Sequence, residues 1–392
     1  MPATLTTIDA ILKEVYEKQI QDQLQNDVVA LKRIEKTSDG VTETSGGKYV
    51  DFPIRVRRNH GIGYRAEGGQ LPAAGQQGYA EVHVPLRYGY GRFRLTGQAM
   101  KMSDTNEKAF ARTLQEEQTG LKDDLVKDSA RVIYGDGSGL LTMINDTATS
   151  ATHAVLSTQY LEVGMIVDVQ VASTGVTVLL NTTVDTISGL NVTFGGSFTG
   201  ATTQGVYRQG NRSNEPSGFA NIIADSGTLH TVDPASEPKW KATVKANGGT
   251  PRALSEGIMI ETCDDVRVQG GKVSVIFTGL GVRRAYFNLL TQQRRYSNTK
   301  EFAGGFQGLA FHYGKEIPVV EDVDCPPNKA WFADESEFTV YQSEDWHYAD
   351  DDGNILKWVR DYDSWEGFMR RYWEVGVHKR NAHALLSDLI EG

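Results

Sequence analysis

The 392-residue chain has no long apolar run, contains only two cysteines and carries no excess of positive charge. Its longest apolar stretches, such as VSVIFTGLGV, fall well short of the roughly 20 residues that a membrane-spanning helix needs. The first residues lack the basic and apolar regions of a secretory signal. The sequence therefore predicts a soluble protein made in a cytoplasm.

The two cysteines, Cys263 and Cys325, lie far apart and have no neighbouring cysteine or histidine at metal-ligand spacing. This excludes a zinc motif and a disulfide framework, and favours buried free thiols. The formal net charge of -10 argues against a sequence-reading nucleic-acid binder, which needs a concentrated basic face. An acidic protein can still enclose DNA, because a wall that repels phosphate does not hold its contents fast.

Motifs for catalysis and for cofactors are also missing. The eight histidines form no HExxH pair, and there is no GxSxG elbow. The glycine-rich residues 135–139 follow a predicted helix, whereas a phosphate loop follows a strand and opens a helix. The acidic run at residues 350–354 lacks the ligand spacing of a calcium loop and is typical of a solvated turn. We therefore expect no enzyme activity, no catalytic residue, no metal and no cofactor.

Two stretches have helical periodicity. The first begins after Thr6 or Thr7, and its apolar residues are Ile8, Leu12, Val15, Ile20, Leu24, Val28 and Leu31. The second begins at a capping box of Asp104 and Glu107 and ends before Gly135. Its apolar residues are Phe110, Leu114, Leu121, Leu125 and Val132. About 30 residues at a rise of 1.5 Å predict a rod of about 45 Å.

Residues 46–95 predict a long two-stranded ribbon. Phe52, Ile54 and Val56 alternate in one strand, Val82, Val84 and Leu86 in the other, and the segment between them is rich in Gly, Ala, Gln and Pro. Strands of roughly 15 residues would project by about 50 Å. An isolated ribbon of this kind is only marginally stable in water, so we expect it to lean on another molecule or element.

The rest of the chain alternates strand-like and helix-like segments. Residues 158–212 contain several short alternating strands, which predict a small barrel or sandwich inserted in a larger domain. The segments LSEGIMIETCDDVRVQG and VRRAYFNLLTQQRRY predict helices on either side of a central strand, KVSVIFTGL. This order favours an α/β layer. Residues from 330 onward return to aromatic-rich strands.

Charge is distributed unevenly along the chain. The ribbon is cationic, with Arg55, Arg57, Arg58, Arg65, Arg87, Arg92 and Arg94 as its candidate contact residues. Residues 321–366 are acidic, with Glu321, Asp322, Asp324, Asp334, Glu335, Asp350, Asp351 and Asp352 as candidate partners. Complementary patches on one chain permit head-to-tail association between copies. The alternative is that both patches are hydrated faces of a single subunit.

This order of parts resembles major capsid proteins of tailed phages with the HK ninety-seven fold. The resemblance runs from about residue 10 onward and is carried by GGKYVDFPI before the basic ribbon, by the long helix running into RVIYGDGSGLL, and by GKEIPVVEDVDCPPNKAWFAD. It implies an α+β phage capsid fold and a subunit that self-assembles into an icosahedral capsid around double-stranded DNA.

The resemblance also implies a division of the chain. Residues 1–45 are similar to an N-terminal helical arm and 46–96 to the extended E-loop. Residues 97–135 and 330–392 resemble a P domain containing the spine helix, 136–157 and 213–329 an A domain, and 158–212 a β-rich insertion. The implied partners are further copies in pentamers and hexamers, a separate scaffolding protein, a portal, a possible decoration protein and DNA bound without sequence specificity. The implied location is the virion, with assembly in the host cytoplasm and no membrane partner.

One departure from the family predicts a chemical difference. Some members cross-link through an E-loop lysine, but this chain has no lysine between Lys48 and Lys101. We expect a non-covalent shell, so mature particles should run as single chains on a denaturing gel. A ladder of linked chains would contradict this prediction.

Two other readings remain open from the sequence. An encapsulin-like nanocompartment has the same fold but encloses an enzyme cargo, and nucleic acid inside purified particles would distinguish the two. Residues 158–212 could also serve as a surface module that binds a ligand such as a glycan.

Overall fold

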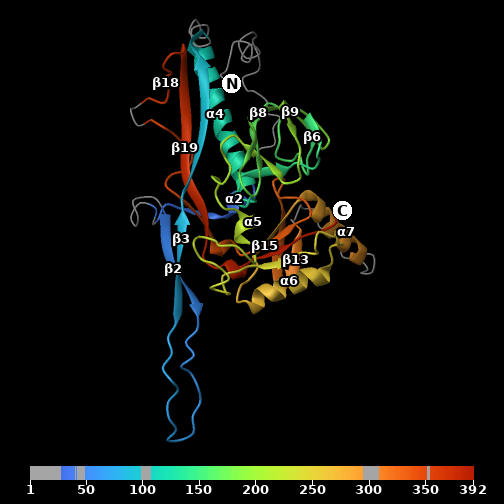
Figure 1. Cartoon of the computed structure of the whole chain (residues 1–392). Coiled ribbons are helices and arrows are strands. Elements are labelled where there is room, and N and C mark those ends of the chain that lie inside the picture. The colour runs from blue at the N-terminus through green and yellow to red at the C-terminus, as the bar shows by residue number, and fades with distance from the viewer. Residues whose placement is uncertain (1–27, 40, 42–48, 99–106, 295–308, 351–353) are drawn as a thin grey trace.

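The computed structural model describes residues 28–39, 41, 49–98, 107–294, 309–350 and 354–392. Its strands form three six-stranded sheets and one two-stranded hairpin, and the hairpin projects from the rest of the molecule (Figure 1). Helices are few and strands many, so the expected α+β class is confirmed. Within the described ranges, no helix combines the length and apolarity needed to cross a membrane.

The first sheet is a long ribbon supported by a long helix. Its strand order is β1-β16-β19-β17, and β4 and β18 also pair with β19. The strands are β1 Glu35–Thr37, β4 Arg87–Thr96, β16 Phe338–Gln342, β17 His347–Tyr348, β18 Lys357–Trp358 and β19 Ser364–Val377. Helix α4, Glu107–Val132, lies along the β4–β19 pair (Figure 1). A Cβ on Gly91 of β4 would lie 2.5 Å from Leu125 Cδ1, so a larger residue there would force the Leu125 side chain to move.

The second sheet has its own core. Its order is β5-β10-β7-β8-β9-β6. The strands are β5 Leu140–Met143, β6 Thr149–Ala154, β7 Ile166–Val171, β8 Thr177–Ser188, β9 Asn191–Thr199 and β10 Gln204–Arg208. Val167, Val169, Val184, Val192 and Phe194 are buried in a cluster that contains only residues of this part of the chain. A separate core is what an inserted domain requires.

The third sheet is an α/β layer. Its order is β11-β20-β15-β12-β14-β13. The strands are β11 Thr243–Lys245, β12 Val275–Thr278, β13 Ala310–Tyr313, β14 Lys315–Glu321, β15 Ala330–Ala333 and β20 Ala384–Leu386. The helices α6 Glu256–Val268 and α7 Leu280–Arg294 cover one face, and Ser255 Oγ caps α6 by accepting from the amide of Ile258. The short helical elements are α2 Ala30–Arg33, α5 Phe219–Ile222, η1 Glu335–Glu337 and η2 Arg380–Ala382.

The main core joins the first and third sheets around Phe219. The centroid of its ring lies 5.1 Å from that of Phe338, 5.6 Å from Phe277 and 6.1 Å from Trp331. Since Phe338 belongs to the first sheet and Phe277 and Trp331 to the third, one buried side chain fixes the two sheets against each other.

The predicted long helix, the two later helices and the central strand are confirmed. Helix α4 covers most of the predicted rod, and α6, β12 and α7 coincide with the three predicted segments. All four residues of β12 are buried, as expected for a strand covered on both faces. Val28 and Leu31 of the first predicted helix are buried. Its other apolar residues, and Asp104 of the capping box, lie outside the described residues.

Sheet pairing corrects three predicted boundaries. The strand β3, Gly78–Pro85, pairs with β2, Tyr49–Arg57, but β4 pairs with β19, so the range 46–96 is not one ribbon. The inserted sheet begins with β5 and not at residue 158. The range 330–392 is divided, because β15 and β20 lie in the third sheet while β16 and β19 lie in the first. Strand alternation is the same whichever strand becomes the partner, so the sequence could not distinguish these pairings.

The glycine-rich residues 135–139 form the turn between α4 and β5. Gly137 and Gly139 have φ values of +81° and +78°, and Asp136 Oδ1 accepts a hydrogen bond from the Ser138 amide at 2.9 Å. The loop therefore follows a helix, as predicted, and leads into a strand.

Candidate subunit interface

The base of the hairpin arm, residues 49–85, packs against the body. Val82 and Val84 of β3 are fully buried, and the ring of Phe52 on β2 lies 4.8 Å from the ring of His378. The His83 amide donates to the carbonyl of His230 at 3.1 Å. The alternating strands therefore place one apolar face against the subunit's own body.

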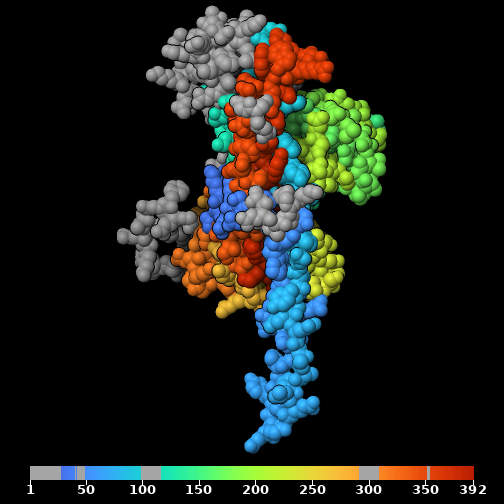
Figure 2. Space-filling model, turned by 90° about the vertical axis from the view of Figure 1, so that its left-hand side faces the viewer, coloured from blue at the N-terminus to red at the C-terminus, as the bar shows by residue number. Residues whose placement is uncertain are grey.

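The tip of the arm, residues 58–77, extends beyond the body without strand pairing (Figures 1 and 2). Its two limbs cross closely at Gly61 and Gly75, where a Cβ on Gly61 would lie 2.6 Å from the Gly75 nitrogen. Asn59 Nδ2 donates to the Gly75 carbonyl at 3.0 Å. Arg65 donates to the carbonyls of Tyr64 and Gln70, both at 2.9 Å. The tip is thus held by its own backbone contacts.

Large apolar side chains on this tip face solvent. Tyr64 is fully exposed, and Ile62 and Leu71 are 81% and 82% exposed. The neighbouring Tyr79 on β3 is also exposed. Single exposed apolar residues are ordinary, but several on one projecting segment indicate a contact surface. The tip has the character of a surface that a second molecule covers.

A cationic cleft of about 890 Å³ lies between the arm and the body. Arg55, Arg57, Arg58 and His60 line it from the arm, and Lys239 lines it from the body. Arg57 is held by Glu237 at 2.7 Å, whereas within the described residues neither Arg55 nor Arg58 pairs with a carboxylate. The cleft therefore offers unneutralised guanidinium groups to an acidic partner.

Three of the other predicted arginines lie outside the cationic cleft. Arg87, Arg92 and Arg94 lie on β4 in the first sheet, so their assignment to the ribbon is wrong. Arg92 lies 3.6 Å from Glu366, and Arg94 donates to Ser364 Oγ at 2.8 Å and stacks over the Tyr362 ring. These contacts follow from the β4–β19 pairing, which the sequence did not reveal.

Most of the predicted acidic partners serve the subunit's own fold. Asp322 is buried and accepts from the Ala30 amide and the Tyr134 hydroxyl. Three other carboxylates form ion pairs within the subunit: Asp324 with Lys127 at 2.8 Å, Glu321 with Arg283 at 2.5 Å, and Glu335 with Arg33. Asp334 accepts a hydrogen bond from the Ser336 amide at 3.3 Å and so caps the short helix η1. Asp322, Asp324 and Asp334 are buried and so do not form an accessible acidic surface, whereas Glu321 and Glu335 remain partly exposed. Asp350 is exposed, and Asp351 and Asp352 lie outside the described residues.

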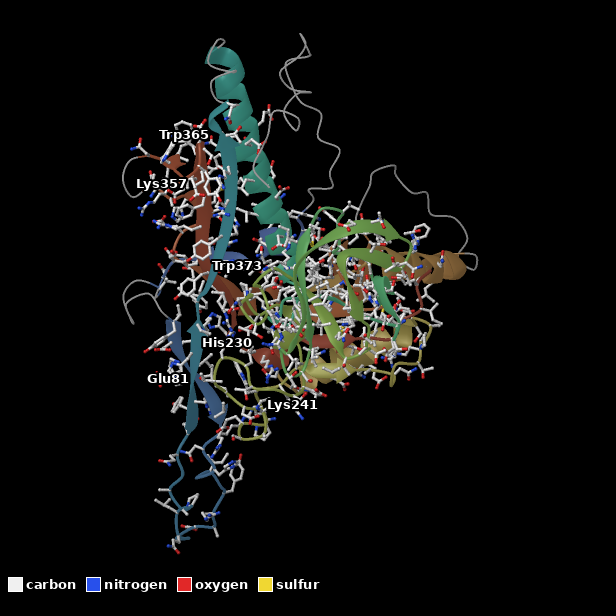
Figure 3. All side chains as sticks on the ribbon, turned by 45° about the horizontal axis from the view of Figure 1, so that its top comes forward. Glu81, His230, Lys241, Lys357, Trp365 and Trp373 are labelled. Atoms are coloured by element: carbon white, nitrogen blue, oxygen red, sulfur yellow. The ribbon has the colours of Figure 1, made fainter. Side chains whose placement is uncertain are left out.

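Sequence reasoning missed an aromatic surface on the first sheet. The Tyr88 and Tyr90 rings pack against Tyr372, with centroids 5.0 and 6.2 Å apart, and both tyrosines of β4 are more than half exposed. At the far end of β19, Trp365 packs edge to face on Trp358 near Lys357 (Figure 3). The alternation Tyr-Gly-Tyr-Gly at residues 88–91 is the sequence signal for this aromatic surface, because alternate residues of a strand share one face. Exposed aromatic residues are frequent in interfaces.

A buried carboxyl lies where the arm meets the first sheet. Glu374 Oε1 accepts from the amides of Ser217 at 2.5 Å and Val375 at 3.1 Å, and Arg87 Nε lies 3.7 Å from Oε2. Burial raises the pKa of Glu374 to about 8 against the lowering effect of these donors. The folded protein therefore keeps a proton that the unfolded chain loses near pH 4.5.

Because Glu374 keeps its proton in the folded state, the free energy of unfolding should fall as pH rises. Between about pH 4.5 and 8 the folded state binds more protons than the unfolded state, so the free energy of unfolding falls by about 1.4 kcal/mol per pH unit from this group. Glu374→Gln removes the titration, and its stability relative to the unaltered chain should improve steadily from pH 5.5 to 7.5. Urea unfolding of the unassembled chain measures the difference. Parallel pH profiles of the two proteins would contradict the buried proton.

Comparisons with known proteins point in one direction. The SU10 major capsid protein family matches residues 138–352. The capsid of cyanophage A-1(L) is similar over 99% of both chains, with a TM-score of 0.58 and 14% sequence identity. The capsid of a native GTA particle is similar over 96% of this chain and 95% of that chain, with a TM-score of 0.53 and 11% identity. At identities this low, the similarity shows that this chain has the same fold as the two capsid proteins. No curated protein matches the sequence.

Proposed function

Because this chain belongs to the SU10 major capsid protein family and is a structural subunit of a phage capsid shell, we propose that the hairpin arm joins neighbouring copies in that shell. The observation that carries the proposal is the tip, whose large apolar side chains extend past the body and find no cover within the described chain. An isolated hairpin is only marginally stable, so contact with a neighbouring copy would stabilise the tip as the shell forms.

The three sheets take different places in the proposed shell. The hairpin arm acts as the E-loop that overlaps a neighbour, and the first sheet with α4 acts as the peripheral domain. The third sheet with α6 and α7 acts as the axial domain, around which pentamers and hexamers form. The second sheet is an insertion, and its separate core supports a role independent of shell closure. These boundaries follow the strand pairing and replace the ranges inferred from the sequence.

The shell encloses double-stranded DNA in this proposal. The net charge of -10 supports a container that does not bind its contents tightly. Icosahedral assembly takes place in the host cytoplasm with a separate scaffolding protein, a portal and a decoration protein as further partners. The subunit works through contacts between copies and not through catalysis. The family match favours this reading over an enzyme-filled compartment.

The arginines of the cationic cleft supply the electrostatic part of the contact. Arg55→Glu, Arg57→Glu and Arg58→Glu together should give a folded, soluble subunit that fails to form shells at concentrations where the unaltered chain assembles. The reason is that like charges replace attraction at every copy of the interface. Electron microscopy and sedimentation measure the outcome.

The matched control replaces the same three arginines by lysine. Lysine keeps the charge, so shells should still form, with weaker contacts because the bidentate geometry is lost. Normal particles from the glutamate variant would remove the cleft from the interface. Nucleic acid protected inside particles purified from infected cells would support the container role, and particles filled with protein alone would contradict it.

A further inference from the structure

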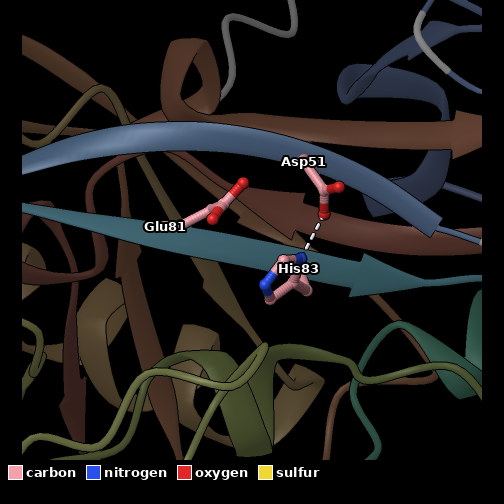
Figure 4. A group of neighbouring side chains, drawn as sticks. All are labelled: Asp51, Glu81 and His83. Atoms are coloured by element: carbon pink, nitrogen blue, oxygen red, sulfur yellow. Dashed lines mark hydrogen bonds and ion pairs between the residues drawn. The ribbon is translucent and has the colours of Figure 1, made fainter. Parts of the chain in front are cut away.

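The outer face of the arm base carries three side chains with ligand atoms for a metal ion. Asp51 lies on β2, and Glu81 and His83 lie on β3 (Figure 4). One ligand atom from each residue lies within 4.8 Å of the others. We propose that these three residues bind a divalent transition-metal ion, with Zn²⁺ as the best fit, and that the ion ties β2 to β3.

Strand register holds the three ligands together. Asp51 lies directly opposite His83 in the antiparallel pair, and Glu81 is two residues before His83 on the same face. The opposite face, with Val82 and Val84, is buried against the body. The ligands therefore stand on a backbone that is fixed from behind, which is the condition for a site that does not depend on mobile loops.

The imidazole of His83 is held in place from two sides. Its Nδ1 contacts Asp51 Oδ1, and the Tyr49 ring meets it edge to face with centroids 5.7 Å apart. The backbone amide of His83 is bonded to the body through the carbonyl of His230. These contacts limit rotation of the imidazole, and a fixed ring orientation is what a metal-binding histidine needs.

Charge also favours a cation at this place. Two carboxylates face one imidazole, and within the described residues no lysine or arginine pairs with Asp51 or Glu81. The Asp51 side chain is 17% exposed and that of His83 40%, so water and ions reach the group from one side. Figure 3 shows Glu81 on the outward side of the arm. A divalent ion would neutralise the cluster.

The ligand set selects the kind of metal. Imidazole nitrogen favours Zn²⁺ and related ions over Mg²⁺ and Ca²⁺, which prefer oxygen ligands alone. Three protein ligands leave a further position for water on the exposed side. Because Asp51 and the other two ligands come from different strands, binding would close the arm base against fraying. The site itself does not rest on the proposed function.

Zinc titration of the full-length chain, after removal of metals with a chelator, tests the binding. Equilibrium dialysis should show a site that His83→Gln weakens at least 100-fold, and Asp51→Asn or Glu81→Gln at least 10-fold. His60→Gln and Glu67→Gln on the tip are the matched controls and should bind as the unaltered chain does. Glu81 is exposed, whereas Asp51 and His83 are partly buried, so circular dichroism checks that each variant is folded.

Amide hydrogen exchange tests the consequence. With Zn²⁺, exchange in residues 50–56 and 79–84 should slow at least 10-fold in the unaltered chain and remain unchanged in the His83→Gln variant. Zinc binding that survives all three substitutions, or that a 100-fold excess of Mg²⁺ displaces, would overturn the site. Binding through the three residues without slower exchange would overturn the tie between the strands.

Discussion

Replacing Ile62, Tyr64 and Leu71 by serine should prevent shell formation even at subunit concentrations 100 times higher than the unaltered chain needs. These three side chains are at least 81% exposed in the single subunit, so their removal takes nothing from its core. Covering a large apolar side chain contributes about 1.5 to 3 kcal/mol. Loss of three such contributions weakens each contact by about 5 kcal/mol, which is more than a thousandfold in affinity.

The control for this variant keeps the apolar surface and changes its shape. Ile62→Leu, Tyr64→Phe and Leu71→Met together should assemble at close to the normal concentration, because volume-conserving apolar changes are tolerated. Light scattering and electron microscopy give the threshold concentrations. Shells from the serine variant at the normal threshold would show that the tip is not part of the contact, and that the body surfaces alone hold the shell.

Replacing Arg380 by methionine should lower the free energy of unfolding by about 3 to 5 kcal/mol. The guanidinium is fully buried and donates only to backbone carbonyls. The five acceptors, all between 2.9 and 3.3 Å, are the carbonyls of Asn221, Ile222, Ser226, Gly227 and Trp240. Methionine fills the volume but leaves these oxygens buried without donors, and each such loss costs about 1 to 3 kcal/mol before relaxation.

A neighbouring residue supplies the comparison. Lys379→Met removes a cation that pairs with Glu337 at 2.5 Å but whose side chain is 56% exposed, so we expect a change of at most about 1 kcal/mol. Arg380→Lys should fall between the two, since an ammonium has three donors where the guanidinium has five. Urea unfolding of the unassembled chain measures all three variants. A loss below 1 kcal/mol for Arg380→Met would mean that the segment 221–240 does not depend on this side chain.

The sequence predicted local elements well because their signals are local. The apolar steps of α4, the helical segment of α6 and the mostly apolar run of β12 each depend on neighbouring residues. It also predicted that strands on either side of residues 58–77 would pair with each other, since both alternate and a turn-rich segment separates them.

These local signals do not show which strands pair when they lie far apart in the sequence. Leu86 separates two strands of the same alternation, and nothing in its neighbourhood says that β4 leaves β3 to join β19, about 270 residues later. The acidic run beginning at Glu321 looked like a surface because charged residues are mostly exposed. Asp322 is instead buried where α2 meets Tyr134, a meeting that only the folded chain creates. The cluster of Asp51, Glu81 and His83 likewise requires the hairpin register, which a tip of about 20 residues does not fix.

The position of β20 has a consequence for the timing of synthesis. This strand, Ala384–Leu386, lies between β11 and β15, inside the third sheet and not at its edge. The residues that complete the sheet are therefore translated after every other strand in it. Until they leave the ribosome, β11 has no partner in that sheet, and the sheet stays open between β11 and β15. A growing chain therefore cannot close this sheet before its last strand has been made, and its earlier strands wait with one pairing position empty.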